Sequence, residues 1–267
     1  MDNKELAYFI TAFGSLNDYG STLVATKQAL DHHDLKLLDG PNSDQGIFAD
    51  ALAGIEAIQK LGPTVDGIIA VNAAFTNAPG EDPGWPGHLR NGYYNEDDRI
   101  SIIIDYRIDE RGRKMPNPYF PPDQVTRGML QAVIEEYQNS SPEELKSTLA
   151  GWRVFARLAK MQPFQDGNKR TALIVANSIT GALTTQKYLV PPINDLDNTE
   201  FTINLMRYYQ AERPDQEEIF VKRLVALAPD SEQRQQAWQE EKNRQNNKID
   251  LATRKIKPLF RNRKRKR

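Results

Sequence analysis

The sequence contains no cysteine and only three histidines in 267 residues. The absence of cysteine excludes disulfides, zinc–thiolate sites and cysteine-ligated iron–sulfur clusters. No apolar stretch is long enough to span a membrane. The N-terminus also lacks a basic segment followed by an apolar run, so a secretory signal is not expected. We therefore expect a cytoplasmic protein without a membrane span.

Charge is distributed unevenly along the chain. The formal net charge is only −1, but residues 254–267 hold nine lysines and arginines and no acid. The rest of the chain is therefore acidic overall, which makes it a poor general binder of nucleic acid. The basic tail alone either contacts polyanions or is a disordered, solubilising end.

Apolar side chains recur at helical spacing along most of the chain. The ranges predicted as helices are 5–13, 21–30, 48–58, 125–137, 142–158, 168–186, 199–211 and 216–227. Residues 231–257 are charged and rich in glutamine, which indicates an exposed or partner-bound helix. Prolines and glycines predict a loop over 76–98, and β-branched residues predict a strand over 99–105, as part of a hairpin within 90–110.

The chemistry is concentrated between two helical stretches, at residues 161–170. Pro163 and Gly167 break the helix there, and a new helix is predicted to begin at Asn168. The N-terminus of a helix offers free backbone N–H groups to an anion. Lys169 and Arg170 oppose the helix dipole at this position, and a bound phosphate would explain their presence.

Asp166 precedes this helix directly. Its carboxylate could hold a hard cation such as Mg²⁺ through oxygen. The alternative is an acid that only complements the helix dipole.

The segment QPFQDGNKRTA resembles the Fic/Doc signature HPFxDGN(G/K)R. The matching residues are Pro163, Phe164, Asp166, Gly167, Asn168, Lys169 and Arg170. The surrounding helices and the Tyr-Phe-Pro-Pro step at 119–122 also look family-like, and the resemblance covers about residues 45–225.

The resemblance implies a mainly α fold, with a Fic-type helical core and a small β-hairpin flap at 90–106. It implies a helical region at 1–70, the core at 71–228, and a charged helix with the basic tail at 229–267. Most Fic proteins transfer AMP from ATP to a hydroxyl side chain of a target protein, and Doc-like relatives transfer phosphate. The flap aligns the target segment by strand pairing.

The resemblance also assigns residue roles. Asp166 would hold Mg²⁺, and the residues that would bind the nucleotide phosphates are Gly167, Asn168, Lys169 and Arg170. Gln162 stands where the family has its general-base histidine. A glutamine amide can orient a hydroxyl but cannot accept its proton near neutral pH. Loss of a general base typically slows a reaction by about 10²–10⁴-fold.

Three further features bear on this departure. His88 is a candidate substitute base, although a solvated loop histidine is the simpler interpretation. Leu173 replaces the family's usual second arginine. The segment 21–26 loosely resembles an inhibitory helix with Ala25 in place of its glutamate, but a plain capped helix explains it equally well.

Three hypotheses follow for function. The first is a Fic-fold protein that binds ATP or another nucleotide but has impaired or lost catalysis. The second is an active nucleotidyl- or phosphotransferase with an altered mechanism. The third is a regulatory module that binds a protein partner through segment 231–257 or the tail.

Overall fold

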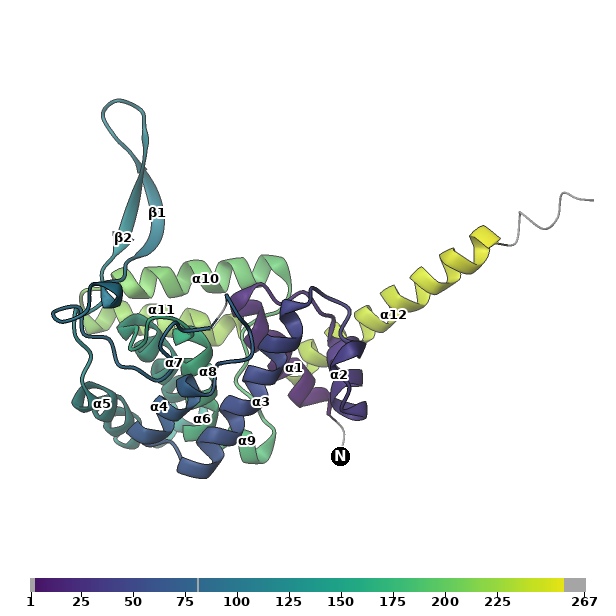
Figure 1. Ribbon diagram of the computed structural model, residues 1–267, viewed down its shortest axis with the longest axis horizontal. Helices are drawn as coiled ribbons and strands as arrows, with labels where there is room; N and C mark the ends of the chain where they lie inside the picture. Colours follow the sequence, from purple (N-terminus) through teal and green to yellow (C-terminus); the bar gives the residue numbers. More distant parts are fainter. Residues whose placement is uncertain (1–2, 81, 257–267) are drawn as a thin grey trace, which may run out of the picture.

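A helical body carries a β-hairpin at one end and a projecting C-terminal helix at the other (Figure 1). The computed structural model describes residues 3–80 and 82–256. The first helices are α1 (Lys4–Gly14), α2 (Leu23–His32), α3 (Ser43–Leu61), α4 (Val65–Ala73), α5 (Arg127–Gln138) and α6 (Pro142–Lys146). The others are α7 (Leu149–Met161), α8 (Asn168–Ile179), α9 (Ala182–Thr185), α10 (Asp195–Gln210), α11 (Pro214–Leu227) and α12 (Ser231–Ile256).

Helices α7 and α8 pack against each other at the centre of the body. Trp152, Phe155 and Leu158 form the buried face of α7, as the helical spacing predicts. Helix α8 is buried along most of its length, because α1, α3, α4 and α7 all lie against it. The short segment between α7 and α8 is therefore held by two well-packed helices.

Two predicted helices are each divided in the structure. The range 142–158 breaks at Thr148, whose φ of 62° is left-handed, so α6 and α7 run separately. Ser141 and Glu144 form a capping box at the start of α6. Leu145, which helical spacing would place on one face with Trp152 and Phe155, is 43% exposed because α6 does not continue the buried face of α7. The range 168–186 ends early, at Gly181 with a φ of 72°.

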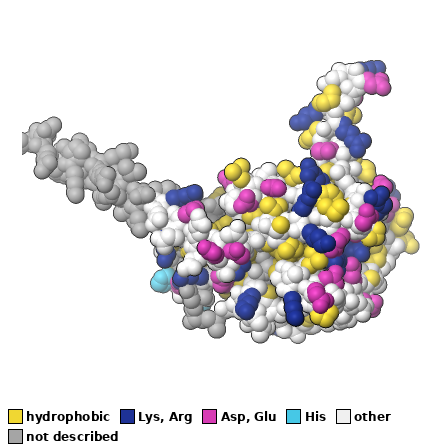
Figure 2. Space-filling view, turned by 180° about the vertical axis from the view of Figure 1, so that it is seen from behind, with side chains coloured by type: hydrophobic (Ala, Val, Ile, Leu, Met, Phe, Trp, Pro, Cys, Tyr) yellow, Lys and Arg dark blue, Asp and Glu magenta, His cyan; other side chains and the backbone are white. Residues whose placement is uncertain are grey.

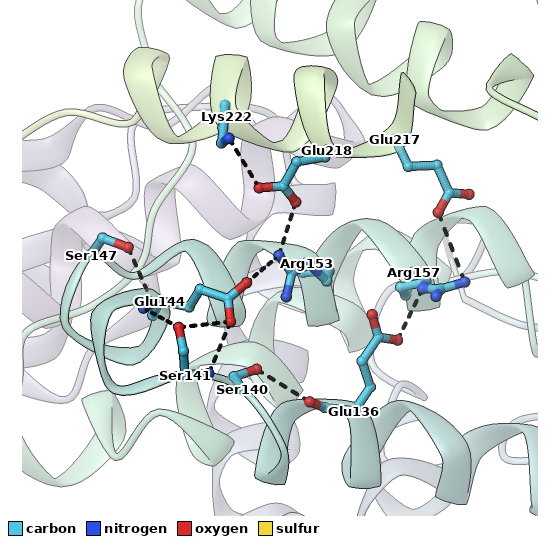
Figure 3. A network of polar contacts seen from close by, with 10 residues as sticks. All are labelled: Glu136, Ser140, Ser141, Glu144, Ser147, Arg153, Arg157, Glu217, Glu218 and Lys222. Carbon is cyan, nitrogen blue, oxygen red and sulfur yellow. Dashed lines mark hydrogen bonds and ion pairs between the residues drawn. The ribbon is translucent and has the colours of Figure 1, made fainter. Parts of the chain in front are cut away.

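A network of ion pairs joins α5, α6, α7 and α11 on one side of the body (Figure 3). Arg153 of α7 donates to Glu144 at 2.6 Å and to Glu218 at 2.9 Å. Arg157, one turn later, pairs with Glu136 at 3.1 Å. These contacts tie the elements around α7 without involving the segment between α7 and α8.

The hairpin lies later in the chain than the predicted flap at 90–106. It consists of β1 (Ile102–Ile108) and β2 (Lys114–Tyr119), paired antiparallel, while residues 90–101 form a loop. The second strand gave no strand signal because it contains Pro116 and Pro118. Proline is tolerated at the edges of sheets, and both strands of a two-stranded sheet are edges.

The N-terminal helices and α12 share the hydrophobic core of the body. Trp238 of α12 is buried, and Arg234 pairs with Glu5 of α1 at 3.1 Å. The expected division into 1–70, 71–228 and 229–267 stays a prediction, although one buried cluster includes side chains from all three parts. Within residues 3–80 and 82–256, no helix is long and apolar enough to cross a membrane. Most of the basic tail, residues 257–267, lies outside the described residues.

Gly46 on α3 provides a test of this packing. A Cβ atom there would lie 2.2 Å from the backbone oxygen of Asn77 and 2.6 Å from the Cα of Ala78. Backbone cannot move aside as a flexible side chain can. We therefore expect Gly46→Ala to lower the free energy of unfolding by about 1–3 kcal/mol, measured by urea denaturation.

Gly128 on α5 is the matched control. Its added Cβ would meet only the Oγ1 of Thr126 at 3.7 Å. Gly128→Ala should stabilise the protein by up to about 1 kcal/mol, through helix propensity alone. Equal effects of the two substitutions would contradict the packing of α3 against residues 77–78.

Candidate anion-binding site

The segment between α7 and α8, residues 162–167, is called the motif loop below. Gln162 caps the C-terminus of α7 with a left-handed φ of 49°. Gly167 has a φ of 72° and precedes the first residue of α8. The left-handed backbone conformation is unfavourable for an L-residue such as glutamine. Contacts with the surrounding structure must therefore hold Gln162 in it.

The side chains of Gln162 and Asn168 hold the loop from inside. The Asn168 amide accepts from the N–H of Phe164 at 2.8 Å and donates to the Phe164 carbonyl at 2.9 Å. It also donates to Oε1 of Gln162 at 3.0 Å. Nε2 of Gln162 donates to the Ala159 carbonyl at 2.6 Å. Both amides are buried, so in this conformation they brace the loop.

The N-terminus of α8 has no side-chain cap, because Gly167 occupies the cap position. It faces a pocket of about 50 Å³ lined by Asn17, Asp166, Lys169 and their neighbours. Within the part of the chain that the structure describes, the Lys169 ammonium makes no hydrogen bond or ion pair. Burial lowers the pKa of Lys169, and Asp166 opposes this shift. Free N–H groups and an unpaired ammonium together suit an anion.

A larger pocket adjoins this one. It has a volume of about 470 Å³ and is lined by residues of α10, by Ser15 and Leu16, and by Lys169, which both pockets share. Pockets for small molecules typically measure about 300–1,000 Å³. The small pocket therefore has room only for an anionic group, and the larger one has room for the rest of a ligand.

Arg170, expected to bind phosphate, is only 1% exposed. Its guanidinium lies 4.9 Å from the ring centre of Phe75. Its NH1 lies 3.7 Å from carboxylate oxygens of both Asp50 and Asp82. In this arrangement the charge of Arg170 is balanced by acidic side chains of the protein.

Asp166 is exposed, and its Oδ1 accepts a hydrogen bond from the N–H of Gly167 at 2.6 Å. Among the described residues, no group of three or more acidic or histidine side chains could hold a metal ion alone. Mg²⁺ is commonly held by one or two carboxylates together with substrate phosphates. Asp166 therefore fits Mg²⁺ only as a ligand shared with a bound nucleotide.

Sequence reasoning missed Arg90, which is fully buried beside the motif loop. Its Nε donates to the Gln162 carbonyl at 2.5 Å, NH1 to the Asp98 carbonyl at 2.6 Å, and NH2 to the Pro122 carbonyl at 3.0 Å. Burial lowers its pKa, and Asp98 and Asp123 oppose this shift. A single arginine within a loop rich in glycine and proline has no periodic partner, so no sequence signal singles it out.

Asn72 of α4 was missed for a similar reason. Its Nδ2 donates to the Asp166 carbonyl at 3.0 Å, and its Oδ1 accepts from the N–H of Gly87 at 2.8 Å. It is fully buried, and it joins the motif loop to the loop over 84–99. In the sequence it is one asparagine near the end of an apolar helix.

His88, the candidate substitute base, is tied into its own loop. Its Nε2 lies 2.9 Å from Oδ2 of Asp98, and its ring stacks on Trp85 at 3.7 Å between centroids. It does not line the small pocket at α8. These contacts place His88 among the side chains that hold the loop.

The region compared with an inhibitory helix forms a capped helix. Thr22 is the N-cap of α2, and its side chain accepts from the N–H of Ala25. Leu173, which stands at the position of the family's second arginine, is fully buried within α8.

The motif loop and the helices on both sides of it lie in the part of the chain that resembles known proteins. Residues 64–180 match the model of the Fic/DOC family. No curated protein matches the chain. The matched segment contains α4, the hairpin, α7, the motif loop and α8.

Among solved structures, a fragment of Fic-1 from C. elegans has the same fold. The TM-score is 0.58 at 12% sequence identity, and the match covers 91% of this chain and 65% of that one. A glutamate-to-glycine variant of that fragment matches with a TM-score of 0.52 at 13% identity, covering 91% and 63%. The chain thus spans slightly less than two thirds of these structures, and the match shows a mainly helical Fic-like fold with an antiparallel hairpin.

The pair of Asp50 and Asp82 gives a prediction about pH. Burial, then a hydrogen bond with Asp50, raises the pKa of Asp82 to about 7, although Arg170 opposes this. Below about pH 3.8 the carboxyl of Asp82 is protonated in both folded and unfolded chains, and its contribution to stability is fully present. Between about pH 3.8 and pH 7, the Asp82 carboxyl ionises in the unfolded chain but stays largely protonated in the folded chain. The free energy of unfolding therefore falls as the pH rises through this range.

We therefore expect the wild-type protein to lose stability relative to Asp82→Asn between pH 5 and pH 8. Asparagine keeps the shape of the side chain and cannot ionise. Urea unfolding of both proteins at the two pH values measures the difference. Parallel pH profiles would show that Asp82 ionises normally.

Proposed function

We propose that the chain binds the phosphate groups of ATP or a similar nucleotide at the N-terminus of α8 and has little or no transferase activity. The uncapped helix N-terminus with the unpaired ammonium of Lys169 carries this proposal. Helix N-termini bind phosphate through free N–H groups and the helix dipole. The adjoining pocket of about 470 Å³ would accommodate the nucleoside.

Asp166 would hold Mg²⁺ together with the nucleotide, and Mg²⁺ would neutralise phosphate charge there. Gly167 lets the backbone approach the anion closely. Lys169 would contact the phosphates, since it lines both pockets. The Arg170 guanidinium would contact the phosphates only after giving up its ion pairs with Asp50 and Asp82. In this conformation it stabilises α8 instead.

Gln162 explains the proposed loss of catalysis. In AMP transfer, a target hydroxyl oxygen bonds to the α-phosphorus, the bond from phosphorus to the pyrophosphate oxygen breaks, and a base takes up the hydroxyl proton. The Gln162 amide cannot take up that proton near neutral pH. The remaining positive groups would still favour the transition state, which allows at most slow turnover.

A histidine at position 162 should restore transfer. Histidine is one of the residue types enriched in left-handed conformations, so the backbone at Gln162 can accept it. We expect Gln162→His, with Mg²⁺ and α-phosphate-labelled ATP in a cell lysate, to label protein about 10²–10⁴-fold faster than the wild type. Labelled bands on a gel measure the rate.

Two controls accompany this experiment. Gln162→Asn introduces no base and should add no label, and Asp166→Ala in the histidine variant should abolish the label. Equal labelling by the wild type would overturn the inactive-enzyme proposal and require another base. Label with γ-labelled but not α-labelled ATP would indicate phosphate transfer instead.

A regulatory module is the second candidate function. The first half of α12 packs on α2 and pairs with α1 through Arg234 and Glu5, and its second half extends away from the body (Figure 1). Such a helix offers a surface to a partner protein. A pull-down with the full chain, compared with a chain ending at Gln245, which keeps the buried Trp238 and the Arg234–Glu5 ion pair, tests this candidate. Equal recovery of every protein would rule out a partner on the second half of α12.

A further inference from the structure

Arg90 makes hydrogen bonds to several chain segments around the motif loop. Each of its three guanidinium nitrogens donates to a backbone carbonyl of a different segment, at Gln162, Asp98 and Pro122. Its own backbone N–H donates to the Pro163 carbonyl at 2.9 Å, and its carbonyl accepts from Val125 at 3.0 Å. Residue 90 therefore holds both Gln162 and Pro163 at the start of the loop.

Asp98 holds the other part of the same loop. Its Oδ1 accepts from Nε2 of Gln165 at 2.8 Å, and its Oδ2 accepts from the N–H of Asn91 at 2.7 Å and contacts His88. The carboxylate is fully buried. These hydrogen bonds lower the pKa of Asp98 against the raising effect of its burial, so the carboxylate stays ionised as an acceptor.

The two residues thus contact the motif loop at both Gln162 and Gln165. Gln162 is in an unfavourable left-handed conformation, and such residues persist only where the surroundings over-determine them. The Arg90 bond to its carbonyl is charge-assisted and short, which is the strong type. A loop fixed at residues 162, 163 and 165 presents Gly167 and the α8 N-terminus in one orientation.

We propose that Arg90 and Asp98 form a clamp that positions the motif loop, and that anion binding at α8 depends on this clamp. The clamp is a positioning element, because neither side chain lines the small pocket at α8. The second half of the proposal rests on the proposed nucleotide binding. The first half concerns only the loop and can be tested without a ligand.

Amide hydrogen exchange of the full chain tests the clamp. In the motif loop, the amide N–H of Gln162 donates to the Leu158 carbonyl and that of Phe164 donates to the Asn168 side chain. These hydrogen bonds protect both amides from exchange. Arg90→Lys keeps the positive charge but cannot donate to three carbonyls in a fork. We expect it to speed exchange of the peptide spanning 162–170 by about tenfold or more, as loss of a charge-assisted bond implies.

Arg153→Lys is the matched control. Arg153 is partly buried and donates to two acidic side chains, but it joins α6, α7 and α11 away from the loop (Figure 3). It should leave exchange over 162–170 within about twofold of the wild type. Equal acceleration by both variants, or acceleration spread evenly over all helices, would overturn the clamp.

Asp98→Asn provides a second variant should Arg90→Lys fail to fold. Asparagine keeps one acceptor oxygen and loses the charge that holds Gln165 and Asn91. We expect faster exchange confined to peptides over 88–99 and 162–170, and unchanged exchange there would contradict the clamp.

Calorimetric titration with Mg-ATP separates the two proposals. If the wild type binds, both clamp variants should bind about tenfold more weakly, while Arg153→Lys binds normally. Unchanged affinity in the clamp variants would overturn the dependence of binding on the clamp. If the wild type does not bind Mg-ATP, the proposed function is overturned. The hydrogen-exchange rates would still test whether Arg90 and Asp98 position the motif loop.

Discussion

The buried guanidinium of Arg90 holds three chain segments together, and the geometry of the motif loop depends on it. A guanidinium buried in protein must use its donors, because unsatisfied charged groups are costly away from water. Arg90 uses three nitrogens on the carbonyls of residues 162, 98 and 122. The turn after α7, the loop before the hairpin and the chain leading into α5 therefore meet at one side chain.

The motif loop leads into a helix N-terminus without a side-chain cap, while the side chains around it make their contacts within the protein. Gln162 and Asn168 bond each other and the loop backbone, and Arg170 lies between Asp50 and Asp82. The charge that remains available to a ligand belongs to Lys169 and the backbone N–H groups. This arrangement favours the binding of an anion over acid–base chemistry.

The hairpin stands beside a separate apolar surface. It projects from the body, and hydrophobic side chains cover part of the surface below it (Figure 2). A pocket of about 480 Å³ lies between β1 and α10, lined by Ile102, Ile104, Ile203 and Met206 among others. Docking of a target protein on the hairpin stays a prediction, now moved from 90–106 to 102–119.

Much of the helical framework could be predicted because amphipathic spacing is local information. The sequence also located the break before α8, since Pro163 and Gly167 interrupt a helix by their own geometry. It could not locate β2, whose Pro116 and Pro118 are tolerated only because the strand is an edge. The sequence did not single out Arg90, Asn72 and Asp98, because the contacts that matter here reach the motif loop, far away in the chain. Tertiary contacts of that kind leave no periodic pattern.

The position of a bound anion tests the central claim most directly. Amide NMR spectra of the ¹⁵N-labelled chain, recorded with and without Mg-ATP, report each backbone N–H separately. We expect the largest shifts at Gly167, Asn168 and Lys169, and a loss of affinity of about tenfold in Lys169→Met, which removes the unpaired charge. A matched Lys60→Met on the surface of α3 should bind normally. Absence of any shift at Gly167, Asn168 and Lys169 would contradict an anion site at the N-terminus of α8. Equal affinity in Lys169→Met would contradict a role for the Lys169 charge in that site.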